Sequence, residues 1–165
     1  MINLKNNMNL IITGHTSGIG KYIYEKYGGV GLSRSTGFDI CKDDIGQHLY
    51  DSILINNAYS FDDPDAQLKI LQHSYNLAMK VICIGTNSQY EGIYKTSKDK
   101  LKKACKEYFL QGYNITYLAL GKVDTPYTQK YHPDNHVINK EYLLNCIEFI
   151  LNSPYRIEIL SVRPD

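Results

Sequence analysis

The sequence predicts a single α/β domain, residues 1–165, in which helices cover both faces of a doubly wound parallel sheet. Three observations lead to this prediction. Short apolar runs alternate with amphipathic stretches, which is typical of parallel strands joined by helical crossovers. The first apolar run ends in a glycine-rich turn that opens into a helix. Finally, 43% of the 165 residues are hydrophobic, which is enough to form a core.

Each expected element follows from its own local pattern. Apolar runs bounded by glycines or polar residues predict about six to seven strands, at residues 8–13, 30–33, 38–40, 52–56, 81–84, 115–120 and 156–162. Periodic apolar positions predict helices at 18–27, 64–79, 94–111 and 140–152, with one or two helical turns within 42–50. Only four residues separate Arg34 from Asp39, so we expect no helix between the second and third strands. The irregular stretch 124–139 follows the carboxyl end of a strand, where ligands bind in such sheets, and is a candidate substrate flap.

Charge and cysteine content exclude several classes of protein. Lys and Arg total 18 and Asp and Glu total 17, so the net charge of +1 gives no support for binding to nucleic acid or to a membrane surface. No apolar run approaches the length of a membrane-spanning helix, and the first residues lack the apolar segment of a secretion signal. The four cysteines are widely spaced and the five histidines show no metal-ligand spacing, so neither a disulfide framework nor a metal site is expected. These features predict a cytoplasmic protein.

The turn that follows the first strand carries glycines at positions 14, 18 and 20. Because glycine lacks Cβ, it permits close approach of a pyrophosphate to the N–H groups at the start of a helix. We therefore predict that this turn binds a nucleotide; an ordinary glycine-rich turn between strand and helix is the alternative. The residues expected to contact the phosphates are Gly14, Thr16, Ser17, Gly18, Ile19 and Gly20.

The spacing Gly-x-x-x-Gly-x-Gly after Thr13 resembles that of the short-chain dehydrogenase/reductase family. Three further segments in the family's order extend the resemblance over most of the chain: Asn56-Asn57-Ala58, Tyr94-x-x-x-Lys98 and Leu120-Gly121-Lys122-Val123-Asp124-Thr125. Tyr59 stands where the family has glycine, and Leu120 where it has proline. The resemblance implies a Rossmann-like fold that binds a nicotinamide cofactor.

Tyr94 and Lys98 can carry acid–base chemistry. On a helix they lie one turn apart on one face, and the ammonium is expected to lower the pKa of the phenol, which is normally about 10. An incidental Tyr and Lys on a surface helix is the alternative. In the family, the tyrosine exchanges a proton with the substrate oxygen, while the lysine also holds the nicotinamide ribose.

The resemblance further implies a hydroxyl that donates to the substrate carbonyl, here Thr86 with Ser88 as the alternate. Asn76 is the nearest candidate for the family's helix asparagine, but its spacing does not fit.

The end of the second strand decides between the two nicotinamide cofactors. An acidic residue there would bind the adenosine ribose and repel a 2′-phosphate, and this chain has Ser33-Arg34 instead. Arg34 offers a planar guanidinium and Ser33 a hydroxyl, so we expect NADP(H); a solvated surface arginine is the alternative. The resemblance adds Asp39 and Ile40 beside the adenine, Asn57 and Ala58 along the adenosine, and Val123 and Thr125 at the nicotinamide carboxamide.

Together these features predict an NADP(H)-dependent oxidoreductase that interconverts a carbonyl and an alcohol of a small molecule. A sensor or interaction protein that binds NADP(H) without catalysis is a second interpretation, because the segment from Thr86 to Tyr94 is shorter than in the family. A nucleotide-sugar reductase or epimerase is a third. We expect substrate choice to depend on residues 89–93 and 124–139. The resemblance also implies a homodimer or higher homo-oligomer formed through the helix that carries Tyr94.

Overall fold

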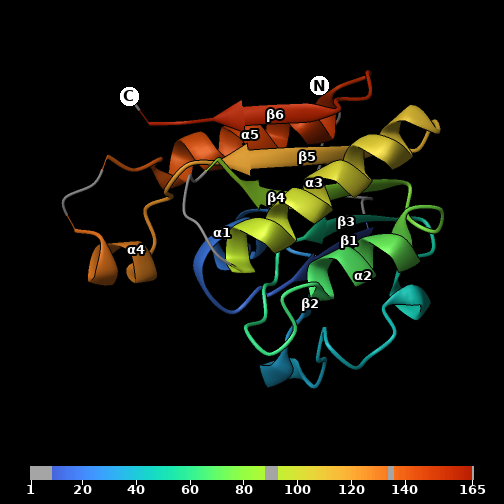
Figure 1. Ribbon diagram of the computed structural model, residues 1–165, viewed down its shortest axis with the longest axis horizontal. Helices are drawn as coiled ribbons and strands as arrows, with labels where there is room; N and C mark the ends of the chain where they lie inside the picture. Colours follow the sequence, from blue (N-terminus) through green and yellow to red (C-terminus); the bar gives the residue numbers. More distant parts are fainter. Residues whose placement is uncertain (1–8, 88–92, 134–135, 165) are drawn as a thin grey trace.

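The computed structural model describes residues 9–87, 93–133 and 136–164, and its centre is a sheet of six strands (Figure 1). In chain order these are β1 (Asn9–Thr13), β2 (Val30–Leu32), β3 (Ser52–Asn56), β4 (Lys80–Thr86), β5 (Ile115–Leu120) and β6 (Ile159–Val162). Their spatial order is β2-β1-β3-β4-β5-β6, and every neighbouring pair is parallel. The strand order therefore reverses between β1 and β3, the point at which ligands bind in doubly wound sheets. The predicted fold class is confirmed.

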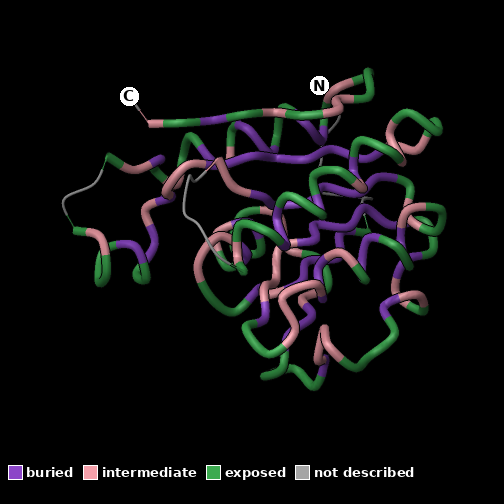
Figure 2. Tube along the Cα trace, viewed as in Figure 1, coloured by how far each residue is buried: buried purple, intermediate pink, exposed green. Residues whose placement is uncertain are grey.

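Helices cover both faces of this sheet (Figure 1). They are α1 (Gly18–Tyr27), α2 (Ala66–Ser74), α3 (Ile93–Leu110), α4 (Pro126–Tyr131) and α5 (Lys140–Asn152). α1 and α5 share one apolar layer with Leu10 and Ile12 of β1, whereas α2 and α3 share the other with Ile11. This alternation arises because successive side chains of a strand point to opposite faces. Figure 2 shows the result, with a buried centre and exposed outer helix faces.

The segment between β2 and β3 holds two 3₁₀ turns, η1 (Arg34–Thr36) and η2 (Gly46–His48), and no α-helix. Of these, η1 lies in the short interval from Arg34 to Asp39, where the sequence analysis expected no helix. The prediction of a short strand at 38–40 was wrong. The Asp39 carboxylate accepts the N–H of Cys41 at 3.0 Å, so the chain turns on itself here instead of pairing with β2. The apolar side chains that complete the α2/α3 layer in this segment are Phe38, Ile45 and Leu49.

Some elements are shorter than predicted. α2 spans 66–74 instead of 64–79, because the chain turns after Ser74, whose hydroxyl donates to a carbonyl of the preceding turn at 3.2 Å. Beyond it, Tyr75 stacks on Tyr108 of α3 with ring centroids 4.2 Å apart, which fixes the turn against its neighbour. Within the described parts of the chain, no helix has the length and apolar content needed to cross a membrane.

Candidate active site

The hydroxyl of Thr13 ties the carboxyl ends of β1 and β3 together. Its Oγ1 accepts the N–H groups of Asn57 at 2.9 Å and Ala58 at 3.0 Å, and the Asn57 side chain donates to Thr13 O at 3.1 Å. Thr13 is fully buried, so these bonds are shielded from water. As a result, the two residues expected along the adenosine lie directly against the glycine turn, where a Cβ on Gly14 would be 3.1 Å from Ala58.

The glycine turn is packed more closely than side chains would allow. A Cβ on Gly20 would lie 2.3 Å from the backbone oxygen of Gly14. Above Gly18, which has a φ of +52°, a Cβ would meet nothing nearer than Cγ2 of Thr125 at 3.9 Å. α1 begins here, and its N-cap residue Ser17 makes no side-chain hydrogen bond to the first-turn amides. Open space beside first-turn amides that the Ser17 side chain does not cap fits a diphosphate group. The remaining residues of the predicted set are Thr16, which is exposed, and Ile19, which packs partly against the α1/α5 layer.

Tyr94 and Lys98 lie together at the start of α3. The Lys98 ammonium is 5.4 Å from the centre of the Tyr94 ring and 5.5 Å from that of Tyr59. The two rings meet edge to face, with centroids 4.8 Å apart. Lys98 is only 4% exposed, and burial lowers its pKa to about 8. The lysine charge is therefore held in a largely dry site against two aromatic side chains.

The pKa of Tyr94 is raised, whereas the helix spacing predicts that it is lowered. Burial raises the pKa of the Tyr94 phenol, and the neighbouring phenols of Tyr59 and Tyr127 raise it further. The ammonium lies over the face of the Tyr94 ring, where it interacts with the π-system. Tyr94 consequently keeps its proton at neutral pH and has the protonation state of a proton donor.

The buried ammonium predicts a pH-dependent stability. Because folding lowers the pKa of Lys98 from 10.5 to about 8, the unfolded chain binds more protons between these two pH values. Stability from this group therefore increases as the pH rises through that window. Between these two pH values, we expect the wild type to gain stability relative to Lys98→Met as the pH rises. The expected gain in free energy of unfolding is about 1.4 kcal/mol for each unit by which folding lowers the pKa of Lys98.

Urea unfolding of both proteins between about pH 7 and pH 10.5 measures this difference. Lys95→Met, at an exposed position of the same helix, is the control. A difference between wild type and Lys98→Met that stays constant across the range would show that the Lys98 charge is not desolvated by folding.

Thr86 lies at the carboxyl end of β4, and Tyr117 links it to Lys98. The Tyr117 hydroxyl accepts the N–H of Thr86 at 3.2 Å and donates to the backbone oxygen of Lys98 at 3.4 Å. Its ring fills the space over Gly85, where a Cβ would lie 2.0 Å from the ring. The alternate hydroxyl, Ser88, and the expected specificity residues 89–92 lie outside the described residues.

Gln67 is a site residue that the sequence analysis missed. It lies on the first turn of α2, is 3% exposed, and accepts a hydrogen bond from the Lys98 ammonium. The sequence did contain a signal for its burial. Gln67 precedes Ile70 and Leu71 by three and four residues, so on a helix it lies on their buried face. Asn76 is exposed and follows the carboxyl end of α2, so the structure does not bring it to Lys98.

The residues expected at the adenosine phosphate lie on and beside η1. Ser33 is buried, and its hydroxyl is 2.9 Å from that of Ser35. This hydrogen bond between the two hydroxyls stabilises the η1 turn. The Arg34 guanidinium is 3.7 Å from the Asp62 carboxylate, and the two side chains are 61% and 82% exposed. An ion pair between such exposed groups is weak, so Arg34 can exchange it for an anionic ligand.

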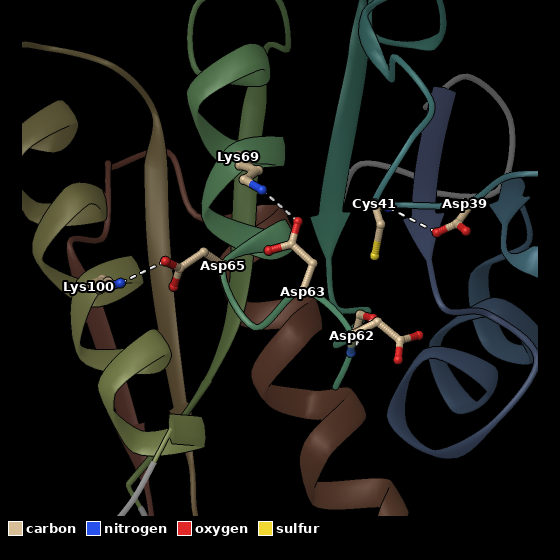
Figure 3. Close-up of polar contacts among 8 residues, drawn as sticks. Asp39, Cys41, Asp62, Asp63, Asp65, Lys69 and Lys100 are labelled. Atoms are coloured by element: carbon tan, nitrogen blue, oxygen red, sulfur yellow. Dashed lines mark hydrogen bonds and ion pairs between the residues drawn. The ribbon is translucent and has the colours of Figure 1, made fainter.

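Asp39 and Ile40 lie in the turn after η1. The bond from the Cys41 N–H holds the pKa of the Asp39 carboxyl below its usual value, and Figure 3 shows this contact. Ile40 packs partly into the α2/α3 layer, which places this turn beside the sheet. The same figure shows two ion pairs, each 2.6 Å, that tie the segment after β3 to α2 and α3: Asp63–Lys69 and Asp65–Lys100.

Val123 and Thr125 follow the carboxyl end of β5. Val123 forms a bridge with Ile138, and Oγ1 of Thr125 accepts the N–H of Thr128 at 3.2 Å as the N-cap of α4. The Thr125 methyl group also faces Gly18 of the glycine turn. The residues expected at the two ends of a dinucleotide therefore lie along one edge of the sheet, at the carboxyl ends of its strands (Figure 1).

No protein-family model matches the chain, and no curated protein matches it in sequence. Solved structures match its fold. A "short chain dehydrogenase/reductase family protein" has a TM-score of 0.72 at 14% identity, over 97% of both chains. The 3-alpha-hydroxysteroid dehydrogenase from Pseudomonas sp. B-0831, complexed with NADH, has a TM-score of 0.69 at 14% identity, over 93% of this chain and 94% of that one. The 3-oxoacyl (acyl-carrier-protein) reductase from Agrobacterium tumefaciens C58, with NADP bound, has a TM-score of 0.70 at 14% identity. The match covers 98% of this chain and 93% of that one.

Proposed function

Since the chain has the fold of the short-chain dehydrogenases/reductases, we propose that it is an NADP(H)-dependent oxidoreductase that interconverts a carbonyl and an alcohol of a small molecule. The observation that carries the proposal is the buried Lys98 ammonium beside the Tyr94 ring. This pair lies on the same edge of the sheet as the glycine turn, so a bound dinucleotide and the acid–base pair would meet there.

The residues at this edge fit a nicotinamide dinucleotide. The first-turn amides of α1 beside Gly18 would hold the diphosphate, and Arg34 would hold the 2′-phosphate of the adenosine. Thr125, which lies against Gly18, would contact the nicotinamide end. When bound, the cofactor supplies the hydride that reduces the substrate carbonyl.

In carbonyl reduction, Tyr94 would donate its proton to the substrate oxygen. Its raised pKa keeps the phenol protonated at neutral pH, which suits this role. The Lys98 ammonium stabilises the negative charge that develops on Tyr94 as the proton leaves. Thr86, at the end of β4, would donate a hydrogen bond to the same substrate oxygen.

Fluorescence titration with NADPH and NADH in parallel tests the cofactor assignment. We expect both nucleotides to bind and NADPH to bind more tightly. Absence of binding by either nucleotide would contradict the proposed function as a whole. Tighter binding of NADH would contradict only the assignment of Arg34 to the 2′-phosphate.

Arg34→Ala is expected to weaken NADPH binding about tenfold while changing NADH binding little, because only NADPH presents the charged group that Arg34 would bind. The preference for NADPH, measured as a ratio of dissociation constants, should therefore fall. Lys26→Ala, in the last turn of α1, removes the same charge elsewhere on the surface and is the control. An equal loss of affinity for both nucleotides would assign Arg34 a structural role instead.

One observation favours a second candidate function, an NADP(H)-binding sensor without catalysis. Tyr59 stands where the resemblance calls for glycine, and its ring lies against both Tyr94 and Lys98. A ring in this place restricts the room beside the acid–base pair. NADPH binding without its oxidation by a broad panel of aldehydes and ketones, in the wild type and in Tyr59→Gly, would establish the sensor and exclude the enzyme.

A further inference from the structure

Lys98 is a buried cation held by neutral partners. Its Nζ donates to Oε1 of Gln67 at 2.5 Å and to the backbone oxygen of Ile84 at 3.0 Å. Among the residues that the structure describes, no carboxylate forms an ion pair with it. A buried ammonium requires hydrogen bonds in place of water, and here a side-chain amide and a backbone carbonyl provide them.

The surroundings allow only one orientation of the Gln67 amide. Its Nε2 donates to the backbone oxygens of Asn56 at 2.5 Å and Ile84 at 3.0 Å. The reverse orientation would place Oε1 against two acceptors and the NH₂ group against the ammonium of Lys98. The side chain of Asn56 in turn donates to the backbone oxygen of Gln67 at 2.8 Å, which fixes the first turn of α2 on β3. Oε1 of Gln67 therefore faces Lys98 as a consequence of the fold.

An ion pair near the surface also joins the start of α2 to α3 (Figure 3). Asp65, the residue before α2, pairs with Lys100 of α3 at 2.6 Å. Asp65 lies two residues before Gln67, and Lys100 two residues after Lys98. The packing that brings Asp65 to Lys100 thus also sets the buried amide of Gln67 opposite the buried ammonium of Lys98.

We propose that Gln67 is the positioning residue for Lys98, which it holds beside Tyr94 without neutralising its charge. The proposal rests on the proposed function, in which that charge stabilises the developing phenolate of Tyr94. A glutamate at position 67 would pair with the ammonium and reduce its field at the Tyr94 ring. A leucine there would leave Lys98 with the carbonyl of Ile84 alone. The neutral amide both fixes the ammonium and preserves its charge.

The test measures the Lys98 ammonium directly, without need of activity. The protein is labelled with ¹³Cε-lysine, and the Lys98 resonance is assigned by its absence from Lys98→Met. We expect the isosteric Gln67→Glu to raise the pKa of Lys98 by about 1–3 units, because an opposite charge favours the ammonium. Gln67→Leu should lower this pKa, because it removes an acceptor from the charged form. Gln72→Glu, at an exposed position of the same helix, is the matched control and should leave the pKa of Lys98 unchanged.

The pH dependence of kcat/KM separates positioning from a merely structural role. We expect the Gln67→Glu profile to shift in the same direction as the Lys98 titration. We expect Gln67→Leu to reduce kcat at least about tenfold, part of the 10²–10⁴-fold that acid–base catalysis supplies, with little change in KM. Lower unfolding temperatures in both variants, with the Lys98 titration and the pH profile unmoved, would overturn the proposal. If the titration shifts as expected while the wild type reduces no carbonyl, the positioning role stands and the proposed function fails.

Discussion

Tyr94→Phe is expected to reduce NADPH-dependent carbonyl reduction by about 10²–10⁴-fold and to leave NADPH affinity nearly unchanged. The substitution removes the only atom that Tyr94 would contribute to proton transfer. The ring itself, which meets Tyr59 edge to face and lies beneath the Lys98 ammonium, is retained. The measurement compares kcat/KM for a reducible aldehyde or ketone with the dissociation constant of NADPH from fluorescence.

Tyr155→Phe is the matched control, because that tyrosine is 79% exposed in the loop before β6. It removes the same hydroxyl from another part of the chain and should leave both quantities unchanged. Turnover of Tyr94→Phe at the wild-type rate would remove Tyr94 from the mechanism. Loss of NADPH binding in Tyr94→Phe would instead assign the hydroxyl to the nucleotide site.

Gly20→Ala is expected to weaken NADPH binding by about tenfold or more. The added Cβ would lie 2.3 Å from the backbone oxygen of Gly14 and 2.7 Å from Nδ2 of Asn57, so the turn must move. Overpacking of this kind costs about 1–3 kcal/mol, and relief of the clash displaces the amides that would hold the diphosphate. Fluorescence titration measures the loss of affinity, and thermal unfolding measures the strain.

Lys21→Ala is the control for this substitution. Lys21 is the next residue of α1 and is exposed, so the same helix is altered without contact with the turn. Its NADPH affinity should stay close to that of the wild type. An unchanged affinity in Gly20→Ala would show that the nucleotide does not bind at the glycine turn.

The two substitutions are designed to separate chemistry from binding. Tyr94→Phe removes the proposed proton donor and leaves the proposed nucleotide site intact. Gly20→Ala deforms the proposed nucleotide site and retains Tyr94 and Lys98. An enzyme loses turnover in both variants, and for different reasons. A sensor shows no turnover to lose and responds only to Gly20→Ala.

Local patterns in the sequence were sufficient for several elements of the fold. The predicted bounds of α1, β3, β5 and α5 agree with the structure. In each case a run of apolar residues or a buried helix stripe is bounded by glycine or polar residues, and these signals act over a few residues. The order of the motifs also predicted the fold and the placement of Tyr94 after the β4 strand. The assignment of individual residues to cofactor and substrate remains a prediction.

The tertiary structure alone decided what surrounds Tyr94 and Lys98. Gln67 reaches Lys98 from 31 residues away in the chain, and Tyr117 links Lys98 to Thr86 from a third element. The pKa of Tyr94 depends on burial and on neighbouring rings, so the spacing of Tyr94 and Lys98 on one helix predicted the wrong direction. The same holds for 38–40, where a carboxylate–amide bond replaces strand pairing. Helix and strand periods are local, whereas the charge, burial and hydrogen bonding of a site depend on contacts between distant parts of the chain.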